Sequence, residues 1–231
     1  MLKVCGLHGE GAAEDITLLA SIGVELVGLW HGVPDGEAEL SRDELERLAG
    51  LARASGSVES VLVTLEHDPA AIADTLARAG IRWVQLHAYQ PPSMVQRLKA
   101  MAPGEVRIVK ALHVNGRHCV EAKLVRGYER AGVDVFLIDA ATDDRVGSTG
   151  RSVLPDVAAT VAGELHRPFL LAGGITAHNR PRYGALVRRE GFLGVDVCTA
   201  AWDPAGRLNA AGVTAIRESW SDAGPPRDGV G

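Results

Sequence analysis

The stretch Phe169-Leu-Leu-Ala-Gly-Gly-Ile-Thr-Ala-His-Asn179 indicates how this chain folds. Its first four residues are apolar, as in a short buried strand, and two glycines then interrupt the run. Glycine lets a backbone approach a ligand closely, and the polar residues that follow predict a helix, whose N-terminus favours anions. The stretch therefore predicts a strand, a tight turn and a helix start that together bind an anion such as phosphate. The alternative is that the two glycines form only a tight connection.

A second stretch of this kind follows at Gly194-Val-Asp-Val-Cys-Thr-Ala-Ala201, where an apolar run again ends in small residues. Two consecutive strand ends of this type, late in a chain of alternating strands and helices, are typical of the phosphate corner of a (β/α)₈ barrel.

The rest of the chain alternates in the same way. Apolar runs predict strands at residues 2–6, 25–29, 58–64, 83–86, 106–112, 133–138, 169–172 and 193–198. Apolar residues at helical spacing predict helices at 14–22, 93–101, 119–130, 154–165, 177–189 and 208–220, and two more helices capped by Ser41 and Asp68 that end near Gly56 and Gly80.

Eight strand–helix units predict an α/β fold, a (β/α)₈ TIM barrel formed by a single domain over residues 1–220. The last residues, 221–231, are rich in Gly, Pro and Asp and are expected to be a disordered tail. A doubly wound open sheet is the alternative, but it gives no reason for the alternation to stop at eight units.

The bulk composition limits the class of protein. The chain has 231 residues, of which 46% are hydrophobic and 23% charged, and its net charge is −5. These values are typical of a globular protein with a sizeable core, and without a dense basic stripe they argue against nucleic acid as a partner. No apolar run is long enough to cross a membrane, and three widely spaced cysteines do not predict a disulfide framework, so we expect a cytoplasmic protein.

Polar residues at the strand ends are the candidates for chemistry, because function in such a barrel lies where strands meet the following loops. Cys5 is either a base or nucleophile with a favoured thiolate, or a small buried apolar residue. Asp139 is either a proton donor or a carboxylate that caps a turn. Asp196, inside the last strand, is interpreted as structural, and Lys110 as an inward lysine that pairs with Asp139 or another carboxylate, or meets substrate.

Two further features lie near the predicted strand ends. Gly147-Ser-Thr-Gly-Arg151 is a small-residue turn that either adds N–H groups and Arg151 to the anion site or is a lid without specific contacts. Histidines 8, 31, 87 and 113 also lie at strand exits, but their spacing does not support a metal site, so we expect no metal.

Several of these segments together resemble one family. They are Lys3-Val-Cys-Gly6, Val84-Gln-Leu-His87, Val109-Lys-Ala111, Leu137-Ile-Asp139, Gly147-Ser-Thr-Gly-Arg151, Leu171-Ala-Gly-Gly-Ile175 with Asn179, and Gly194-Val-Asp-Val197. In this order and spacing, over about residues 2–220, they are similar to the phosphoribosylanthranilate isomerase family of tryptophan biosynthesis. The first and last segments are the most specific, whereas Ala-Gly-Gly alone is common in phosphate-binding barrels.

The resemblance implies an aldose–ketose isomerase that performs an Amadori rearrangement of a small phosphosugar amine without a metal or organic cofactor. It implies that Cys5 is the general base that removes the C2 proton and that Asp139 is the general acid that helps to open the ribose ring. The phosphate is then expected at Gly150, Gly173, Gly174, Cys198, Thr199 and Ala200. The expected substrate pocket adds Lys3, Trp30, His31, Gln85, His87, Lys110 and Arg151.

The sequence departs from the family where the aglycone is expected to bind. The family's loop after the second strand usually reads close to Ser-Pro-Arg, and its arginine holds the anthranilate carboxylate. Here the loop is Trp30-His-Gly-Val-Pro-Asp-Gly-Glu37, without an arginine before Arg42. The fourth strand exits into Ala88-Tyr89 where the family has glycine, and the eighth into Cys-Thr-Ala-Ala-Trp where the family has Ser-Ser-Gly-Val-Glu.

These departures leave three alternatives to the tryptophan-pathway enzyme. The first is a specialised relative that acts on another phosphosugar amine, and the second is a barrel that binds a phosphorylated ligand without catalysis. The third is a lyase or aldolase, for which Lys110 is the strand candidate for a Schiff base. A monomer and a homodimer are both consistent with the sequence.

Overall fold

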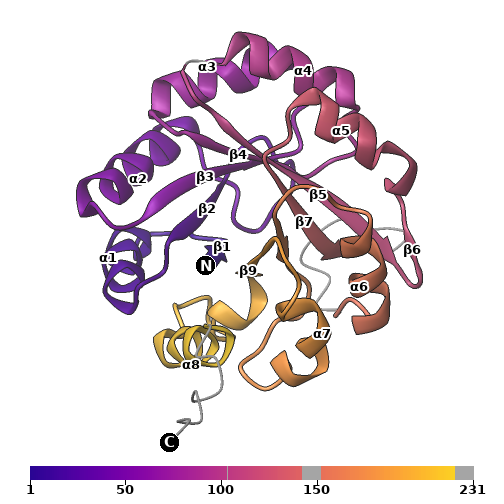
Figure 1. Ribbon diagram of the computed structural model, residues 1–231. Helices are drawn as coiled ribbons and strands as arrows, with labels where there is room; N and C mark the ends of the chain where they lie inside the picture. Colours follow the sequence, from indigo (N-terminus) through magenta and orange to yellow (C-terminus); the bar gives the residue numbers. More distant parts are fainter. Residues whose placement is uncertain (103, 142–151, 222–231) are drawn as a thin grey trace, which may run out of the picture.

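The computed structural model describes residues 1–102, 104–141 and 152–221. Its centre is a parallel sheet that closes on itself because β4 pairs with β5 as well as with β3 (Figure 1). The eight barrel strands are β1 (Leu2–Cys5), β2 (Leu26–Trp30), β3 (Glu59–Thr64), β4 (Trp83–Leu86), β5 (Arg107–Asn115), β7 (Val135–Ala140), β8 (Phe169–Leu171) and β9 (Phe192–Val197). The remaining strand, β6 (His118–Cys119), is a short antiparallel addition to β5.

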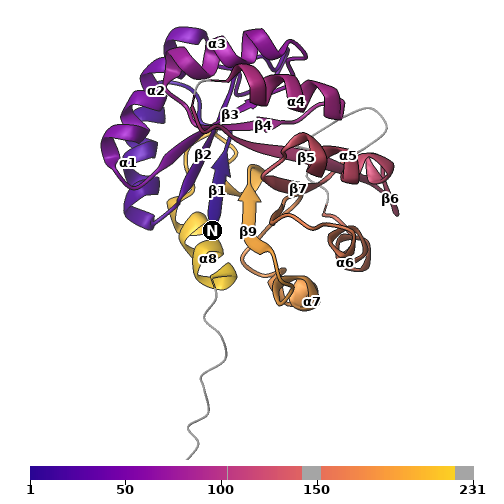
Figure 2. The same ribbon diagram turned by 45° about the horizontal axis from the view of Figure 1, so that its top comes forward.

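Helices surround the barrel on its outside, as Figures 1 and 2 show from two directions. They are α1 (Ala12–Ile22), α2 (Arg42–Ser55), α3 (Pro69–Ala79), α4 (Pro92–Met101), α5 (Val125–Ala131), α6 (Pro155–Gly163), α7 (Gly184–Val187) and α8 (Ala210–Trp220). Helix α8 contacts α1, so the last helix lies beside the first and completes the ring. The predicted (β/α)₈ barrel in one domain is confirmed.

Strand residues alternate between two apolar regions, because successive side chains of a strand point to opposite faces. Val4, Val27 and Ile138 belong to the large cluster beneath the helices, whereas Cys5 and Leu137 belong to a smaller cluster inside the barrel. Buried polar residues also point inward, among them Lys3, Gln85, Asp139 and Asp196. Charged groups in so apolar a place need partners, and these residues meet at the candidate site described below.

The helix-start signals of the sequence correspond to real caps. The side chain of Ser41 accepts a bond from the N–H of Glu44, and the Glu44 carboxylate accepts one from the N–H of Ser41, at 3.4 and 2.9 Å. Asp68 likewise caps α3, with Pro69 at its first position. The predicted helix ends at Gly56 and Gly80 are left-handed, as glycine allows.

Two predicted helices are wrong in extent. The predicted helix at 119–130 is replaced in part by a β5–β6 hairpin with Gly116-Arg117 at its turn, followed by η1 (Ala122–Leu124) and the short α5. The predicted helix at 177–189 is reduced to η2 (Arg180–Tyr183) and the four residues of α7. In the second segment, Pro181 and Gly184 interrupt the helical pattern.

Some predictions fall partly or wholly on undescribed residues. Gly150, Arg151 and the rest of the 147–151 turn lie outside the described residues, as does the expected tail apart from Ser221. The domain boundary at residue 220 therefore stays a prediction. Within the described part of the chain, no helix is long and apolar enough to cross a membrane.

Replacing Ser41 by Ala tests whether the capping box contributes to stability. The change removes the acceptor for the Glu44 N–H, and we expect the free energy of unfolding to fall by about 1 kcal/mol. Urea unfolding followed by circular dichroism measures the loss. The exposed Thr17→Ala in α1 is the control, with an expected change within about 0.5 kcal/mol. Equal stability of the Ser41→Ala protein and the unaltered chain would contradict the assignment.

Candidate active site

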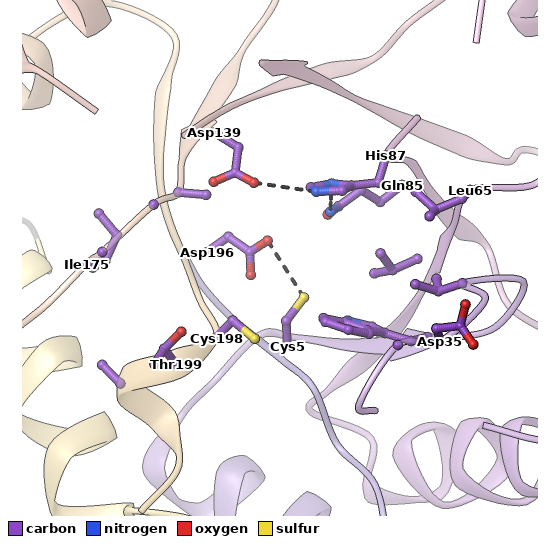
Figure 3. A pocket seen from close by; sticks show the side chains of 18 of the residues that line it. Cys5, Asp35, Leu65, Gln85, His87, Asp139, Ile175, Asp196, Cys198 and Thr199 are labelled. Carbon is purple, nitrogen blue, oxygen red and sulfur yellow. Dashed lines mark hydrogen bonds and ion pairs between the residues drawn. The ribbon is translucent and has the colours of Figure 1, made fainter. Parts of the chain in front are cut away.

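A cavity of about 420 Å³ opens at the carboxyl ends of the barrel strands. This volume is suitable for a small metabolite. Ten of the residues predicted for the site line it: Cys5, Trp30, Gln85, His87, Asp139, Gly173, Gly174, Cys198, Thr199 and Ala200. Figure 3 shows Ile175 and Thr199 on one side, Asp35 and Leu65 on the other, and Cys5, Asp139 and Asp196 between them.

The first chemical group of the cavity is a cluster formed by Lys3, Cys5 and Asp196. The ammonium of Lys3 donates to the Cys5 sulfur at 2.6 Å and to Asp196 Oδ2 at 2.7 Å. The thiol of Cys5 also points to Asp196 Oδ2, at 3.7 Å. Lys3 is fully buried and Asp196 is only 7% exposed. Asp196 therefore contacts the candidate base directly, which goes beyond the structural role that its sequence context indicated.

Strand pairing brings these three side chains together. Lys3 and Cys5 are two residues apart on β1 and therefore point to the same inner face. Lys3 is in register with Asp196 on β9, and Cys5 is in register with Gly28 on β2. A Cβ at residue 28 would lie 2.2 Å from the Cys5 sulfur, so only glycine leaves room for the thiol. The sequence reading missed Gly28, since a glycine within an apolar strand has no obvious function by itself.

The charges of this cluster determine the state of the thiol. Burial raises the pKa of Cys5 well above its usual range, and the negative charge of Asp196 raises it further, while Lys3 opposes the shift. Burial alone would lower the pKa of Lys3, but Asp196 and then Cys5 outweigh it, so that this pKa is raised. In the ligand-free site Lys3 is therefore an ammonium ion and Cys5 carries its proton.

The second chemical group is Asp139, at the end of β7. It is 6% exposed, and its Oδ1 accepts a bond from the N–H of Ala140 at 2.8 Å. His87 Nε2 lies 3.4 Å from Asp139 Oδ2, and His87 Nδ1 accepts from Gln85 Nε2 at 2.9 Å. Figure 3 shows Asp139 and Cys5 directed into the same cavity from different strands. The structure thus brings together the two residues to which the sequence assigned acid and base chemistry.

The third part of the cavity is made by the loops that follow β8 and β9. Gly173 and Gly174 both have positive φ, 82° and 60°, which explains the pair of glycines. No α-helix begins directly after them, contrary to the sequence prediction. Asn179 instead folds the loop back, because its side chain donates to the Gly174 carbonyl at 2.8 Å and accepts from Thr176 N–H at 3.0 Å. The predicted strand–glycine–helix motif is therefore a strand, a glycine turn and a folded loop.

The charges that line the cavity are mainly negative. Asp35, Asp139 and Asp196 are the acidic members among the described lining residues, His87 is the basic one, and neither Lys nor Arg occurs there. Among the described lining residues, the groups available to an anion are therefore mainly backbone N–H groups, in the glycine loop after β8 and at η3 (Thr199–Ala201).

Three predicted pocket residues do not line the cavity. Lys3 lies behind the lining and reaches the site through Cys5 and Asp196. His31 turns into its own loop, with Nδ1 at 2.8 Å from the Leu40 carbonyl. Lys110 is not an inward lysine paired with Asp139, because its neighbours Val109 and Ala111 occupy the inner face of β5. Its ammonium lies over the ring of Tyr128 in α5, 5.4 Å from the centroid.

The geometry also bears on two other kinds of chemistry, a Schiff base and a metal site. A Schiff-base mechanism loses its candidate, because Lys110 is absent from the lining and the described lining residues include no other lysine. Among the described residues, no three His, Cys, Asp or Glu side chains gather into a group that could hold a metal ion.

Asp35 and Glu121 were not predicted as site residues, and His113 was noted only as one of four histidines at strand exits. Asp35 lines the cavity in the turn after β2, where its φ of 60° is unusual for a residue other than glycine. His113 and Glu121 are buried beside the cavity, at 0% and 2% exposure. The dipeptide Asn115-Gly116 was the available signal for the hairpin that brings Glu121 back to His113.

A closed barrel whose strand ends place an acid and a thiol across one cavity defines an enzyme of the (β/α)₈ class. Residues 36–201 match the family model of N-(5'phosphoribosyl)anthranilate (PRA) isomerase. The chain is 35% identical to the N-(5'-phosphoribosyl)anthranilate isomerase of Synechococcus sp. (strain JA-2-3B'a(2-13)), over 77% of this chain and 73% of the relative. It is 32% identical to the protein of that name from Afipia carboxidovorans, over 98% of this chain and 92% of the relative.

Solved structures agree with the fold. Phosphoribosyl anthranilate isomerase from Thermus thermophilus superimposes with a TM-score of 0.74 over 94% of this chain and 96% of that chain, at 20% identity. A phosphoribosyl anthranilate isomerase in complex with reduced 1-(o-carboxyphenylamino)-1-deoxyribulose 5-phosphate has a TM-score of 0.69, covering 94% and 97%, at 20% identity. From the family model and the curated relatives, the chain belongs to the phosphoribosylanthranilate isomerase family.

The reactivity of Cys5 tests the electrostatics of the Lys3–Cys5–Asp196 cluster. Burial and Asp196 disfavour the thiolate of Cys5. We therefore expect iodoacetamide at pH 8 to alkylate Cys5 at least about tenfold more slowly than it alkylates the free thiol of glutathione. Asp196→Asn removes the opposing charge while Lys3 remains, and should accelerate alkylation. Lys3→Met should slow it.

Mass spectrometry of the Cys5 peptide measures these rates separately from those of Cys119 and Cys198. A Cys5 that reacts as fast as glutathione, or a rate that Asp196→Asn leaves unchanged, would contradict the described balance of charges.

Proposed function

We propose that this protein catalyses the isomerisation of N-(5-phosphoribosyl)anthranilate to 1-(o-carboxyphenylamino)-1-deoxyribulose 5-phosphate. Membership of the isomerase family supports the reaction. The observation that carries the proposal is the placement of Cys5 and Asp139 in one cavity, between the glycine loops and the loop after β2. An aldose–ketose isomerisation needs a proton donor and a proton acceptor at the same sugar, and these two side chains supply both.

The reaction begins with opening of the ribose ring. Asp139 gives a proton to the ring oxygen, so that the bond from this oxygen to C1 breaks and an imine cation forms between C1 and the aglycone nitrogen. Cys5 then removes the proton of C2, and the electron pair of the broken C2–H bond forms the C1–C2 double bond of an enolamine. The enolamine becomes the ketone when C1 gains a proton and the C2 hydroxyl loses one, so the net reaction neither consumes nor releases a proton.

Cys5 must lose its own proton before it can act as a base. Asp196 Oδ2, 3.7 Å from the sulfur, is the acceptor that the site offers, and Lys3 at 2.6 Å stabilises the thiolate that results. Transfer from the thiol to Asp196 leaves the total charge of the cluster unchanged, so it adds no net charge to the buried site. In this role Asp196 and Lys3 act through Cys5, without contacting the sugar.

The two ends of the cavity differ in chemistry, and this difference sets the orientation of the bound substrate. We place the phosphate at Gly173, Gly174, Thr199 and Ala200, where backbone N–H groups can bind an anion. The anthranilate ring then lies at the opposite end, against the apolar side chains of Trp30, Val33, Pro34 and Leu65. The described lining residues provide no guanidinium for its carboxylate.

The protein is proposed to act in the cytoplasm on this small-molecule substrate, as a monomer or homodimer, without nucleic acid, membrane, metal or organic cofactor. The balanced proton transfers above require no electron acceptor and no Lewis acid, which supports the last part of this proposal.

The direct test follows the loss of substrate fluorescence when purified protein is mixed with phosphoribosylanthranilate. Turnover is expected for the unaltered chain. Cys5→Ser and Asp139→Asn are each expected to lower kcat by about 100-fold or more, because general acid–base catalysis contributes factors of this order. Asp43→Asn, which removes an exposed carboxylate from α2, is the matched control and should keep full activity. Normal turnover by Cys5→Ser and Asp139→Asn would remove the proposed roles.

A further inference from the structure

A second buried group of ionisable side chains lies next to the cavity. Lys110 and His113 come from β5, and Glu121 follows β6, so the β5–β6 hairpin brings all three together. We call Lys110, His113 and Glu121 the hairpin cluster. Their exposures are 0%, 0% and 2%, and none of the three lines the cavity. The mechanism above does not use them.

Glu121 is the centre of the hairpin cluster. Its Oε1 accepts from His113 Nδ1 at 2.5 Å, and its Oε2 accepts from the His113 backbone N–H at 2.8 Å. The Lys110 ammonium lies 3.9 Å from Oε1. Burial alone would raise the pKa of Glu121, but its bonds to His113 and the charge of Lys110 outweigh this and lower the pKa. Glu121 is therefore a buried carboxylate.

The hairpin cluster holds His87 from two sides. Lys110 donates to the carbonyl of Ala88 at 2.8 Å and approaches that of Leu86 at 3.5 Å, the two residues that flank His87. The ring of His113 meets the ring of His87 edge-on, with centroids 5.4 Å apart and an interplanar angle of 85°. One contact fixes the backbone of His87 and the other restricts its ring.

His87 in turn contacts the candidate acid. Its Nε2 lies 3.4 Å from Asp139 Oδ2, as Figure 3 shows, and Asp139 is also the register partner of His113 on the neighbouring strand. Among the described residues, His113 Nε2 is buried without a hydrogen-bond partner. Leaving a buried polar atom unpaired is unfavourable, so the arrangement is not explained by stability alone.

We propose that the hairpin cluster positions His87 against Asp139, and that His113 and Glu121 thereby act as positioning residues for the acid of the isomerisation. The inference rests on the function proposed above. It adds a row of groups, Glu121, His113, His87 and Asp139, that runs from the hairpin into the cavity.

The variants that test this row each remove one of its contacts. Glu121→Gln keeps the size of the side chain but replaces the carboxylate that accepts from His113 Nδ1 by a neutral amide. His113→Phe keeps a ring beside His87 without the nitrogen that bonds to Glu121. If the hairpin cluster positions His87, both changes should alter the surroundings of the His87 ring.

The test compares Glu121→Gln and His113→Phe with the conservative Glu121→Asp. The control is Asp134→Asn, which breaks a contact of 2.7 Å with Lys99 on the outside of the barrel. The first readout, the NMR signals of the His87 ring in ligand-free protein at one fixed pH, does not depend on activity. These signals should shift in Glu121→Gln and His113→Phe, whereas Glu121→Asp should shift them less and Asp134→Asn should leave them unchanged.

The second readout is steady-state turnover, with kcat and KM measured separately. Glu121→Gln and His113→Phe should each lower kcat about tenfold while KM stays within about threefold, because they act on the acid rather than on substrate binding. Glu121→Asp should recover much of the lost kcat. His87 ring signals that match those of the unaltered protein in both Glu121→Gln and His113→Phe would overturn the proposal, whatever the loss of kcat.

Tyr89→Ala keeps the proposal testable if the buried variants fail to fold. The Tyr89 ring covers His113 at 5.0 Å between centroids, and Tyr89 is itself 50% exposed. Removing this ring frees one side of His113 and should shift the His87 ring signals by a smaller amount, and unchanged signals would contradict the inference. If the His87 shifts appear but the unaltered protein does not turn over phosphoribosylanthranilate, the proposed function fails while the positioning of His87 stands.

Discussion

The contact between Lys3 and Asp196 is the one on which the rest of the site depends. It joins the first strand of the barrel to the last, at 2.7 Å, with both side chains almost fully buried. Two charges removed from water are stable only as a pair, and loss of either leaves the other uncompensated. The pair therefore fixes the position of the ammonium that contacts Cys5, and Gly28 on β2 leaves the space that the sulfur occupies.

The acid and the base are placed in different surroundings. Cys5 lies between a buried cation and a buried anion, so its proton can move within the cluster without a change of total charge. Asp139 has no lysine or arginine within ion-pair distance among the described residues and meets His87 instead. Enzymes that use two ionisable groups on one substrate commonly separate their roles by such differences in environment. The barrel supplies this difference from strands on opposite sides of one cavity.

Much of the fold was predictable, since alternating apolar runs, glycine ends and the Ser41 capping box are local signals. Cys5, Asp139, Gly173 and Gly174 were predictable as site residues, because each lies at a strand end. The direction of Lys110 was not, since it depends on which face of β5 turns inward. Glu121 was missed for a related reason: it was assigned to a helix, whereas the turn at Gly116 returns it to His113. Such contacts are set by register and closure rather than by local sequence.

The central claim is that the sugar lies with C2 beside Cys5, its ring oxygen beside Asp139 and its phosphate on the loops after β8 and β9. A crystal structure with bound reduced 1-(o-carboxyphenylamino)-1-deoxyribulose 5-phosphate measures this directly. We expect phosphate oxygens within hydrogen-bonding distance of backbone N–H groups at Gly174 and Ala200, with the Cys5 sulfur in contact with C2. A phosphate bound beside Asp35 and Leu65, or a C2 atom remote from Cys5, would contradict it.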